Sequence, residues 1–311
     1  MAALKQNRQC PQPSESDDVT LPRRNKRDKG RCSNDSVLQV VILAAGMGTR
    51  LGRSLPKPLT VLGDGRSILH RQLDQLRAVL GADTDITLVV GYQAETIIKA
   101  AFGARFVHNP NFATTNTSKS LWYALTASRP GGVLWLNGDV VFEPAILQQA
   151  VPALQDDQSF VCVDTATVGE EEVKYTLDRD GYIKHLSKSV VGGRGEAIGI
   201  NYVSGPDKQT LIEHLEACDE QDYFERAMET AIVDTGLQFR ALDISIYAAV
   251  EVDFEEDLAR ANMRCLPSSI TTPKVLPCPM PAISNMASSG NLKPKNAEAA
   301  NHVWEATKIR R

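Results

Sequence analysis

Hydrophobic positions between residues 37 and 263 alternate between two spacings. Short apolar runs, such as 37–43 and 86–90, are typical of buried strands, whereas residues 67–80 place apolar side chains at helical spacing. In the first half of the chain this pattern predicts strands at 37–43, 86–90, 105–107 and 133–136. It predicts helices at 67–80, 94–102 and 118–127, and a further helix opened by Pro144. Such an order favours a parallel sheet with right-handed crossovers.

The spacing changes after residue 160. Strand-like runs at 160–163, 173–177, 182–186 and 198–203 follow one another closely, and Asp180-Gly181 is a hairpin turn signal. Helices at 207–217, 222–235 and 254–263 and strands at 238–242 and 248–250 complete the pattern. We therefore predict an α/β fold with a Rossmann-like, doubly wound, mainly parallel sheet. An antiparallel hairpin extension is expected over a site at the carboxyl ends of the strands.

Both ends of the chain are polar. Residues 1–36 contain a basic run at 23–29, and residues 265–311 are rich in Pro, Ser and Asn. Such segments cannot bury enough apolar surface to offset their ordering entropy, so we predict a disordered leader, one domain at 37–264 and a disordered tail. A basic arm for nucleic acid or a membrane surface is the alternative for the leader.

Charge and cysteine usage exclude several classes of protein. The 311 residues carry a net charge of -4, which argues against nucleic acid as a partner. The six cysteines show no metal-ligand spacing and are expected to be reduced thiols. No apolar run approaches the roughly 20 residues of a membrane span, and no secretory h-region precedes the domain. We expect a cytoplasmic protein. Whether it forms a homodimer is left open by the sequence.

A glycine-rich turn follows the first predicted strand and reads Leu43-Ala44-Ala45-Gly46-Met47-Gly48-Thr49-Arg50. Free backbone N–H groups in such a turn bind anions. The glycine spacing matches neither a dinucleotide fingerprint nor a P-loop. Two cations, Arg50 and Lys57, follow the glycines and would stabilise the charge that develops on a leaving pyrophosphate.

This turn and the following Pro56-Lys57-Pro58-Leu59 resemble the signature of nucleotidyltransferases that activate sugar phosphates and phospho-alcohols. That signature is Leu-Ala-Ala-Gly-x-Gly-x-Arg, followed by Pro-Lys-x-Leu, and both parts are present without a mismatch. The resemblance covers about residues 37–263 and implies catalytic roles for Arg50 and Lys57. It also implies nucleotide contacts from Leu43, Ala44, Ala45, Gly46, Gly48 and, in the base pocket, Tyr92.

Two aspartates at predicted strand ends are candidate metal ligands. Nucleotidyl transfer needs neutralisation of phosphate charge, which Mg²⁺ held by carboxylates supplies. Asp139 follows Asn137-Gly138, and Asp253 lies in a Glu-x-Asp string. By itself Asp253 is equally well explained as the N-cap of the last helix. The resemblance implies that Asp139 and Asp253 share the magnesium ion.

Four further strings narrow the resemblance to a CDP-forming subgroup, whose members activate phosphocholine, aminoethylphosphonate or inositol phosphate. Asn116 and Ser120 stand in an Asn-x-x-x-Ser-Leu string that implies nucleotide contacts, although helix capping at Thr117 or Ser118 is the simpler alternative. Segments 171–174, 183–188 and 195–200 complete the likeness. They imply that Lys174 and Lys188 meet the acceptor's phosphate or phosphonate and that Glu196 meets its amine or hydroxyl. Exposed charges on hairpins are the alternative.

These observations favour a magnesium-dependent cytidylyltransferase. Its substrates would be CTP and a small phosphorylated alcohol or phosphonate, with release of pyrophosphate. One alternative is a sugar-1-phosphate nucleotidyltransferase that uses UTP or dTTP. A non-catalytic, nucleotide-binding regulatory protein is the other, although such a protein would not need to retain Arg50, Lys57, Asp139 and Asp253 together.

Overall fold

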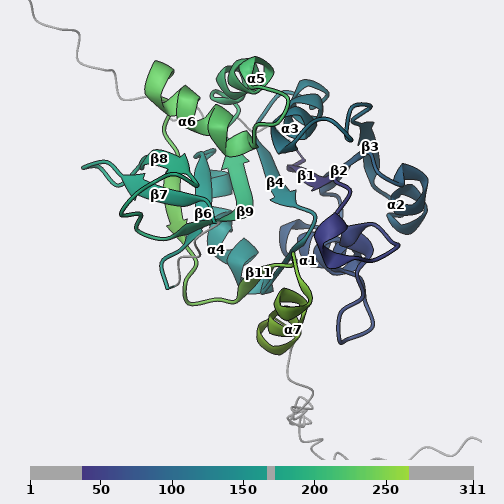
Figure 1. The fold of residues 1–311 in the computed structure, drawn as a ribbon. Coiled ribbons are helices and arrows are strands. Elements are labelled where there is room, and N and C mark those ends of the chain that lie inside the picture. Colours follow the sequence, from purple (N-terminus) through teal and green to yellow (C-terminus); the bar gives the residue numbers. More distant parts are fainter. Residues whose placement is uncertain (1–36, 167–171, 266–311) are drawn as a thin grey trace, which may run out of the picture. The chain divides into compact units, whose positions relative to one another are not determined.

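The computed structural model describes residues 37–166 and 172–265, in which nine strands form one sheet (Figure 1). The strand order is β10-β6-β9-β4-β1-β2-β3, and β7 pairs with β8 and β9 beside this path. The strands are β1 (Gln39–Ala44), β2 (Asp85–Val90), β3 (Arg105–His108), β4 (Val133–Asn137), β6 (Phe160–Asp164), β7 (Lys174–Leu177), β8 (Ile183–Ser187), β9 (Glu196–Val203) and β10 (Arg240–Asp243).

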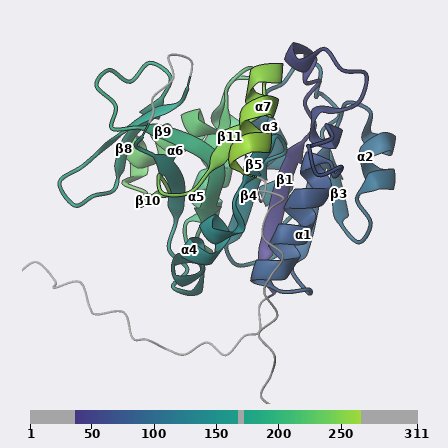
Figure 2. The ribbon, with the colours of Figure 1, turned by 90° about the horizontal axis from the view of Figure 1, so that it is seen from below.

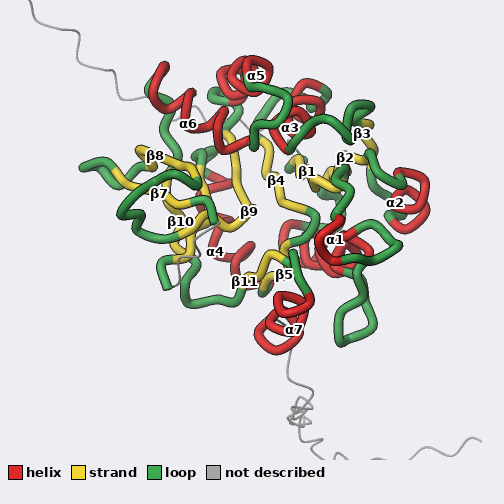
Figure 3. Tube along the Cα trace, in the orientation of Figure 1, coloured by secondary structure: helices red, strands yellow, loops and turns green. Residues whose placement is uncertain are grey.

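The sheet is mainly parallel. Strands β1 to β4 run in one direction, β10 is parallel to β6, and β9 runs antiparallel between β4 and β6. Figure 3 shows β7 and β8 at the left edge of the molecule, where they form an antiparallel hairpin whose turn contains Asp180-Gly181. The predicted doubly wound, mainly parallel sheet with an antiparallel part is confirmed.

Helices cover both faces of the sheet. In Figure 1, α3, α5 and α6 lie above it and α1 and α4 below it, and Figure 2 views the second group from its own side. Successive residues of a strand point to opposite faces, and β1 follows this rule: Val40 and Ile42 belong to one hydrophobic cluster, and Val41 and Leu43 to the other. The helices are α1 (Ile68–Leu80), α2 (Ala94–Ala100), α3 (Thr117–Thr126), α4 (Pro144–Gln155), α5 (Lys208–Ala217), α6 (Phe224–Thr235) and α7 (Glu255–Arg264).

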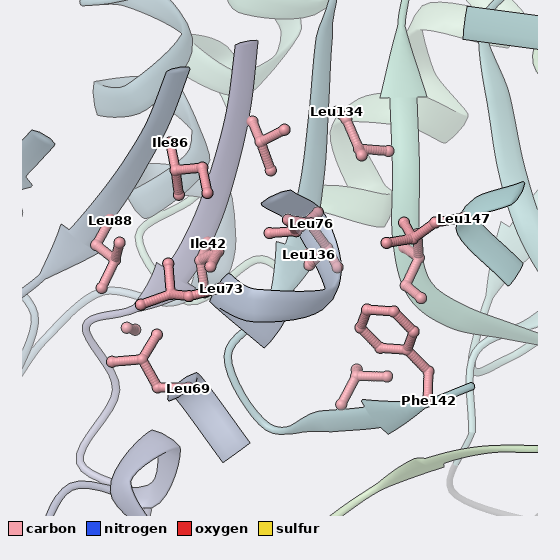
Figure 4. Close-up of a cluster of buried hydrophobic side chains, with 14 of the residues drawn as sticks. Ile42, Leu69, Leu73, Leu76, Ile86, Leu88, Leu134, Leu136, Phe142 and Leu147 are labelled. Atoms are coloured by element: carbon pink, nitrogen blue, oxygen red, sulfur yellow. The ribbon is translucent and has the colours of Figure 1, made fainter. Parts of the chain in front are cut away.

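Helix α1 forms where the sequence predicts it. The hydroxyl of Ser67 accepts a hydrogen bond from the backbone N–H of His70 and caps the first turn, and Gly81 follows the last. Its apolar face, which includes Leu69, Leu73 and Leu76, packs on the sheet (Figure 4). This packing fixes the chain between β1 and α1, which contains two short 3₁₀ helices, η1 (Thr49–Leu51) and η2 (Lys57–Leu59).

A second, two-stranded sheet is absent from the sequence prediction. Strand β5 (Val140–Phe142), directly after Asp139, pairs antiparallel with β11 (Ala249–Glu251), and the N–H of Val252 donates to the carbonyl of Asp139. Helix α7 follows β11 and packs against the loop between β1 and α1 through a third apolar cluster that includes Leu51, Leu62 and Leu258. This two-stranded β5–β11 ribbon therefore brings the last part of the domain next to the end of β4.

The predicted leader and tail, 1–36 and 265–311, lie outside the described residues except for Cys265, whose side chain is buried. Within the described part, Cys162, Cys218 and Cys265 are free thiols. No helix in that part is long and apolar enough to cross a membrane.

Candidate active site

The candidate site lies where the sheet order reverses. The chain passes from β1 outward to β2 and β3 and then returns to β4 on the other side of β1. Ligands of open α/β sheets bind at the carboxyl ends of strands at such a point. Here the first residue after β4 contacts the end of β1, because the N–H of Gly138 donates to the carbonyl of Leu43 at 2.9 Å. A Cβ at residue 138 would lie 2.6 Å from that oxygen, so only glycine fits.

A cavity of about 590 Å³ opens at this point and extends toward the β7–β8 hairpin and α6. Twelve of the side chains or backbone segments that the sequence predicts for the site line it: Leu43, Ala44, Ala45, Gly46, Gly48, Arg50, Lys57, Asn116, Ser120, Asp139, Lys188 and Asp253. Tyr92, Lys174 and Glu196 are not part of the cavity wall. The structure thus brings together residues from six separate parts of the chain.

Lys57 joins the two predicted metal ligands. Its ammonium group donates to Oδ2 of Asp139 at 2.7 Å and to Oδ1 of Asp253 at 2.6 Å. Burial alone would lower the pKa of Lys57, but the charges and hydrogen bonds of Asp139 and Asp253 outweigh it and raise the pKa above its ordinary value. The lysine is therefore a fixed cation. Arg50 lies at the rim, 3.5 Å from the other oxygen of Asp253.

The carboxylate of Asp253 does not cap α7. The N-cap position is Phe254, and the backbone N–H groups of residues 253 and 254 both donate to the side chain of Asp257. The alternative explanation of Asp253 as an N-cap is thus wrong. Because Asp257 satisfies the helix start, the carboxylate of Asp253 faces Lys57 and the cavity.

The two aspartates fit a hard divalent cation. Oδ1 of Asp139 is buried at the cavity wall and has no hydrogen-bond partner among the described residues. A buried carboxylate oxygen without a partner is costly, and oxygen ligands are those that Mg²⁺ prefers. No group of three or more metal-ligating side chains gathers in residues 37–166 and 172–265. Mg²⁺ retains several waters and substrate oxygens, so two carboxylates suffice for it.

Gly48 shapes the loop around Lys57. Its φ is +58°, and a Cβ there would lie 2.7 Å from Cβ of Lys57. We expect Gly48→Ala to lower the free energy of unfolding by about 1–3 kcal/mol, because it combines a left-handed backbone with an overpacked contact. Urea denaturation of the ligand-free protein would measure this loss. Gly46→Ala is the matched control, since nothing lies within 4 Å of its added methyl group, and an equal loss in both variants would contradict the assignment.

Asn116 and Ser120 belong to the start of α3. The side chain of Asn116 accepts from the N–H of Thr117 and is the N-cap, a position the sequence assigns to Thr117 or Ser118. The hydroxyl of Ser120 accepts from Asn109 at 3.1 Å. Both residues therefore support the local fold while lining the cavity.

Tyr92 lies behind the cavity wall. Its N–H donates to the carbonyl of Ala45, and its ring packs at 6.4 Å from that of Phe112, which does line the cavity. Tyr92 is placed to hold the glycine loop and Phe112 in position.

Acidic and aromatic side chains to which the sequence assigns no role also line the cavity. They are Glu172, Tyr223, Glu225 and Glu251. The ammonium of Lys188 lies 4.9 Å from the ring centre of Tyr223, a cation–π contact. Burial, with the nearby charges of Asp139, Glu172 and Glu225, raises the pKa of Glu251 to about 8, and its Oε1 accepts from the N–H of Gly199. Lys174 and Glu196 face each other in register on β7 and β9 instead.

Comparison with known proteins agrees with this geometry. Residues 40–225 match the MobA-like NTP transferase domain family. A CMP-5'-(3-aminopropyl)phosphonate synthase of Streptomyces rubellomurinus is 29% identical over 255 residues, 74% of this chain and 39% of the relative. This chain therefore spans about two fifths of that protein's length.

Two solved structures share the fold. The inositol-1-phosphate CTP transferase from T. maritima has a TM-score of 0.59 at 17% identity, over 71% of this chain and 91% of that chain. The CTP:phosphocholine cytidylyltransferase from Streptococcus pneumoniae has a TM-score of 0.58 at 19% identity, over 73% and 98%.

Proposed function

The chain belongs to the MobA-like NTP transferase domain family, and from this premise we propose that it joins CMP from CTP to a small phosphorylated alcohol or phosphonate. The observation that carries the proposal is the convergence of Lys57, Asp139 and Asp253 beside the glycine loop at one end of a cavity that continues to a charged far end. The cavity is large enough to hold a nucleotide and a second small substrate together.

The chain's own groups account for the binding of the triphosphate. Backbone N–H groups of the loop after β1 would hold its phosphates. Lys57 and Arg50 would stabilise the charge that develops on the leaving pyrophosphate. Asp139 and Asp253 would hold Mg²⁺, which when bound neutralises phosphate charge and polarises the P–O bonds.

The chemical step is an in-line displacement. An oxygen of the acceptor's phosphate or phosphonate forms a bond to the α-phosphorus of CTP, the bond from that phosphorus to the bridging oxygen breaks, and pyrophosphate leaves. A phosphate or phosphonate dianion is already a nucleophile at neutral pH, so no general base is required. Lys188, at the far end of the cavity, is placed to attract the anionic group of the acceptor. Lys174 and Glu196 lie outside the cavity wall, and the proposal does not use them.

The relative that synthesises a CMP-aminopropylphosphonate supports a phosphonate acceptor. A pyrophosphate-release screen tests the proposal by crossing CTP, UTP, dTTP and ATP with five acceptors. These are phosphocholine, 2-aminoethylphosphonate, 3-aminopropylphosphonate, inositol 1-phosphate and glucose 1-phosphate. Release is expected with CTP and a phosphocholine- or phosphonate-type acceptor. Turnover confined to UTP or dTTP with glucose 1-phosphate would overturn it, as would nucleotide binding without release from any pair.

A further inference from the structure

Glu225 lines the cavity at the start of α6, and one oxygen of its carboxyl group has no hydrogen-bond partner among the described residues. Its Oε2 is buried at the start of α6 and accepts no hydrogen bond from any described residue. Leaving a buried carboxylate oxygen unpaired costs more than an ordinary hydrogen bond contributes, so such a group points to a ligand that supplies the missing donor.

The surroundings of Glu225 select the charge of that ligand. Burial raises the pKa of Glu225 to about 7, although the nearby ammonium of Lys188 and a hydrogen bond from its own backbone N–H both lower it. Glu251, on β11, adds a second buried carboxyl group whose pKa is raised partly by the charge of Glu225. The region therefore has an excess of carboxyl groups over cations, and a further positive charge is favoured there.

The donor cannot be an anionic part of the substrates. The glycine loop, Arg50 and Lys57 gather at the opposite end of the cavity, where the triphosphate belongs. Tyr223, two residues before Glu225, already has the ammonium of Lys188 4.9 Å from its ring centre, so a further cation would meet the carboxyl groups and not this ring.

We propose that Glu225 binds the ammonium group of the acceptor, so that the second substrate is a zwitterion with a phosphate or phosphonate at one end and an amine at the other. This inference rests on the proposed function and narrows it. The ammonium lies against Glu225, while the anionic end points toward Lys188 and the α-phosphorus. Acceptors of the same length that end in a hydroxyl offer the carboxylate a hydrogen bond but no positive charge, and they bind less well.

The test compares amino- and hydroxyl-terminated phosphonates of equal chain length, 2-aminoethyl- against 2-hydroxyethylphosphonate and 3-aminopropyl- against 3-hydroxypropylphosphonate, at saturating CTP. Glu225→Gln is expected to raise KM for the amino acceptor by about 10- to 100-fold, the loss of one charge-assisted hydrogen bond, and to leave KM for the hydroxyl acceptor and for CTP within about twofold. Asp234→Asn, an exposed carboxylate on the same helix, is the matched control and should change neither.

A pH profile gives a second readout. Ammonium binding requires ionised Glu225, so KM of the wild type for the amino acceptor should fall as pH rises from 6 to 8 through its pKa of about 7. The hydroxyl acceptor controls for titration of the phosphonate itself, and the difference between the two profiles should vanish in Glu225→Gln. Lys188 and Glu251 face the same group. Because the charge of Glu225 raises the pKa of Glu251, the substitution also lowers that pKa, and the hydroxyl acceptor measured on the same variant controls for this change.

The outcomes separate the two proposals. Equal KM changes for amino and hydroxyl acceptors, or a rise in KM for CTP instead, would overturn the role of Glu225 and leave the proposed function standing. If CMP is transferred from CTP to none of the acceptors, both proposals are overturned.

Misfolding of the variant is checked by thermal unfolding at pH 8. The folded pKa of Glu225 lies above its ordinary 4.5, so the charge costs stability as pH rises between these values, and Glu225→Gln should be at least as stable as the wild type.

Discussion

Replacing Asp139 with asparagine is expected to lower kcat/KM for CMP transfer on the order of 10³-fold, the scale of losing an electrostatic group in the transition state. The substitution keeps the shape of the side chain but removes the charge that would bind Mg²⁺. Because Lys57 retains Asp253 as a partner at 2.6 Å, the local fold should survive.

Two measurements test the Asp139 prediction. Steady-state pyrophosphate release gives kcat/KM, and the change in melting temperature on addition of Mn²⁺ or Mg²⁺ gives metal binding without reference to turnover. Asp83→Asn, an exposed carboxylate in the turn before β2, should match the wild type in both. If the Asp139 variant keeps its turnover and its metal-induced shift, this aspartate is not a metal ligand.

Replacing Lys57 with methionine is the second substitution of large effect. Loss of a cation that faces the leaving pyrophosphate should lower kcat/KM by roughly 10²- to 10³-fold. It also leaves Asp139 and Asp253 without the ammonium between them, so the metal-free protein should lose about 1–3 kcal/mol of stability, less than for a fully buried pair because both carboxylates are partly exposed. Added Mg²⁺ should restore part of this loss.

Thermal unfolding in EDTA and in Mg²⁺, run on both proteins, checks that expectation. The metal-induced rise in melting temperature should be larger in Lys57→Met than in the wild type, since Lys57 and the ion neutralise the same pair of carboxylates. Lys99→Met is the control. It removes an exposed lysine of α2 whose ion pair with Glu95 is long, at 3.9 Å. An identical response to Mg²⁺ in the Lys57 variant and the wild type would contradict the shared role.

Local signals account for what the sequence predicted well. The glycine loop, the apolar face of α1 and the apolar runs of β1, β2 and β4 depend on residues close together in the chain, so periodicity and turn chemistry predict them. The placement of Asp139 at the end of β4 follows from the same rule.

Contacts between segments that are distant in the sequence could not be predicted from such local patterns. The sequence predicts a strand at 248–250, close to β11, but not β5, which has three residues and is too short for a period, and it does not predict that the two pair. Glu225 stands in an ordinary amphipathic helix, and only the packing of α6 beside the hairpin places its carboxyl group in the cavity. The string that pointed to Asp253 already contained Glu251, and segment 171–174 contained Glu172, so the sequence did hold signals for the acidic lining of the cavity.

The ribbon also sets the order in which the site can be completed during synthesis. Lys57 and Asp253 are separated by 196 positions, and Asp253 is held by a strand that pairs with β5 near the end of the described chain. The chain is synthesised from its N-terminal end at about 5–20 residues per second. The glycine loop and Asp139 are therefore available to a nascent chain well before Asp253, and a ribosome stalled short of β11 would display a nucleotide-facing loop with only half of its carboxylate pair.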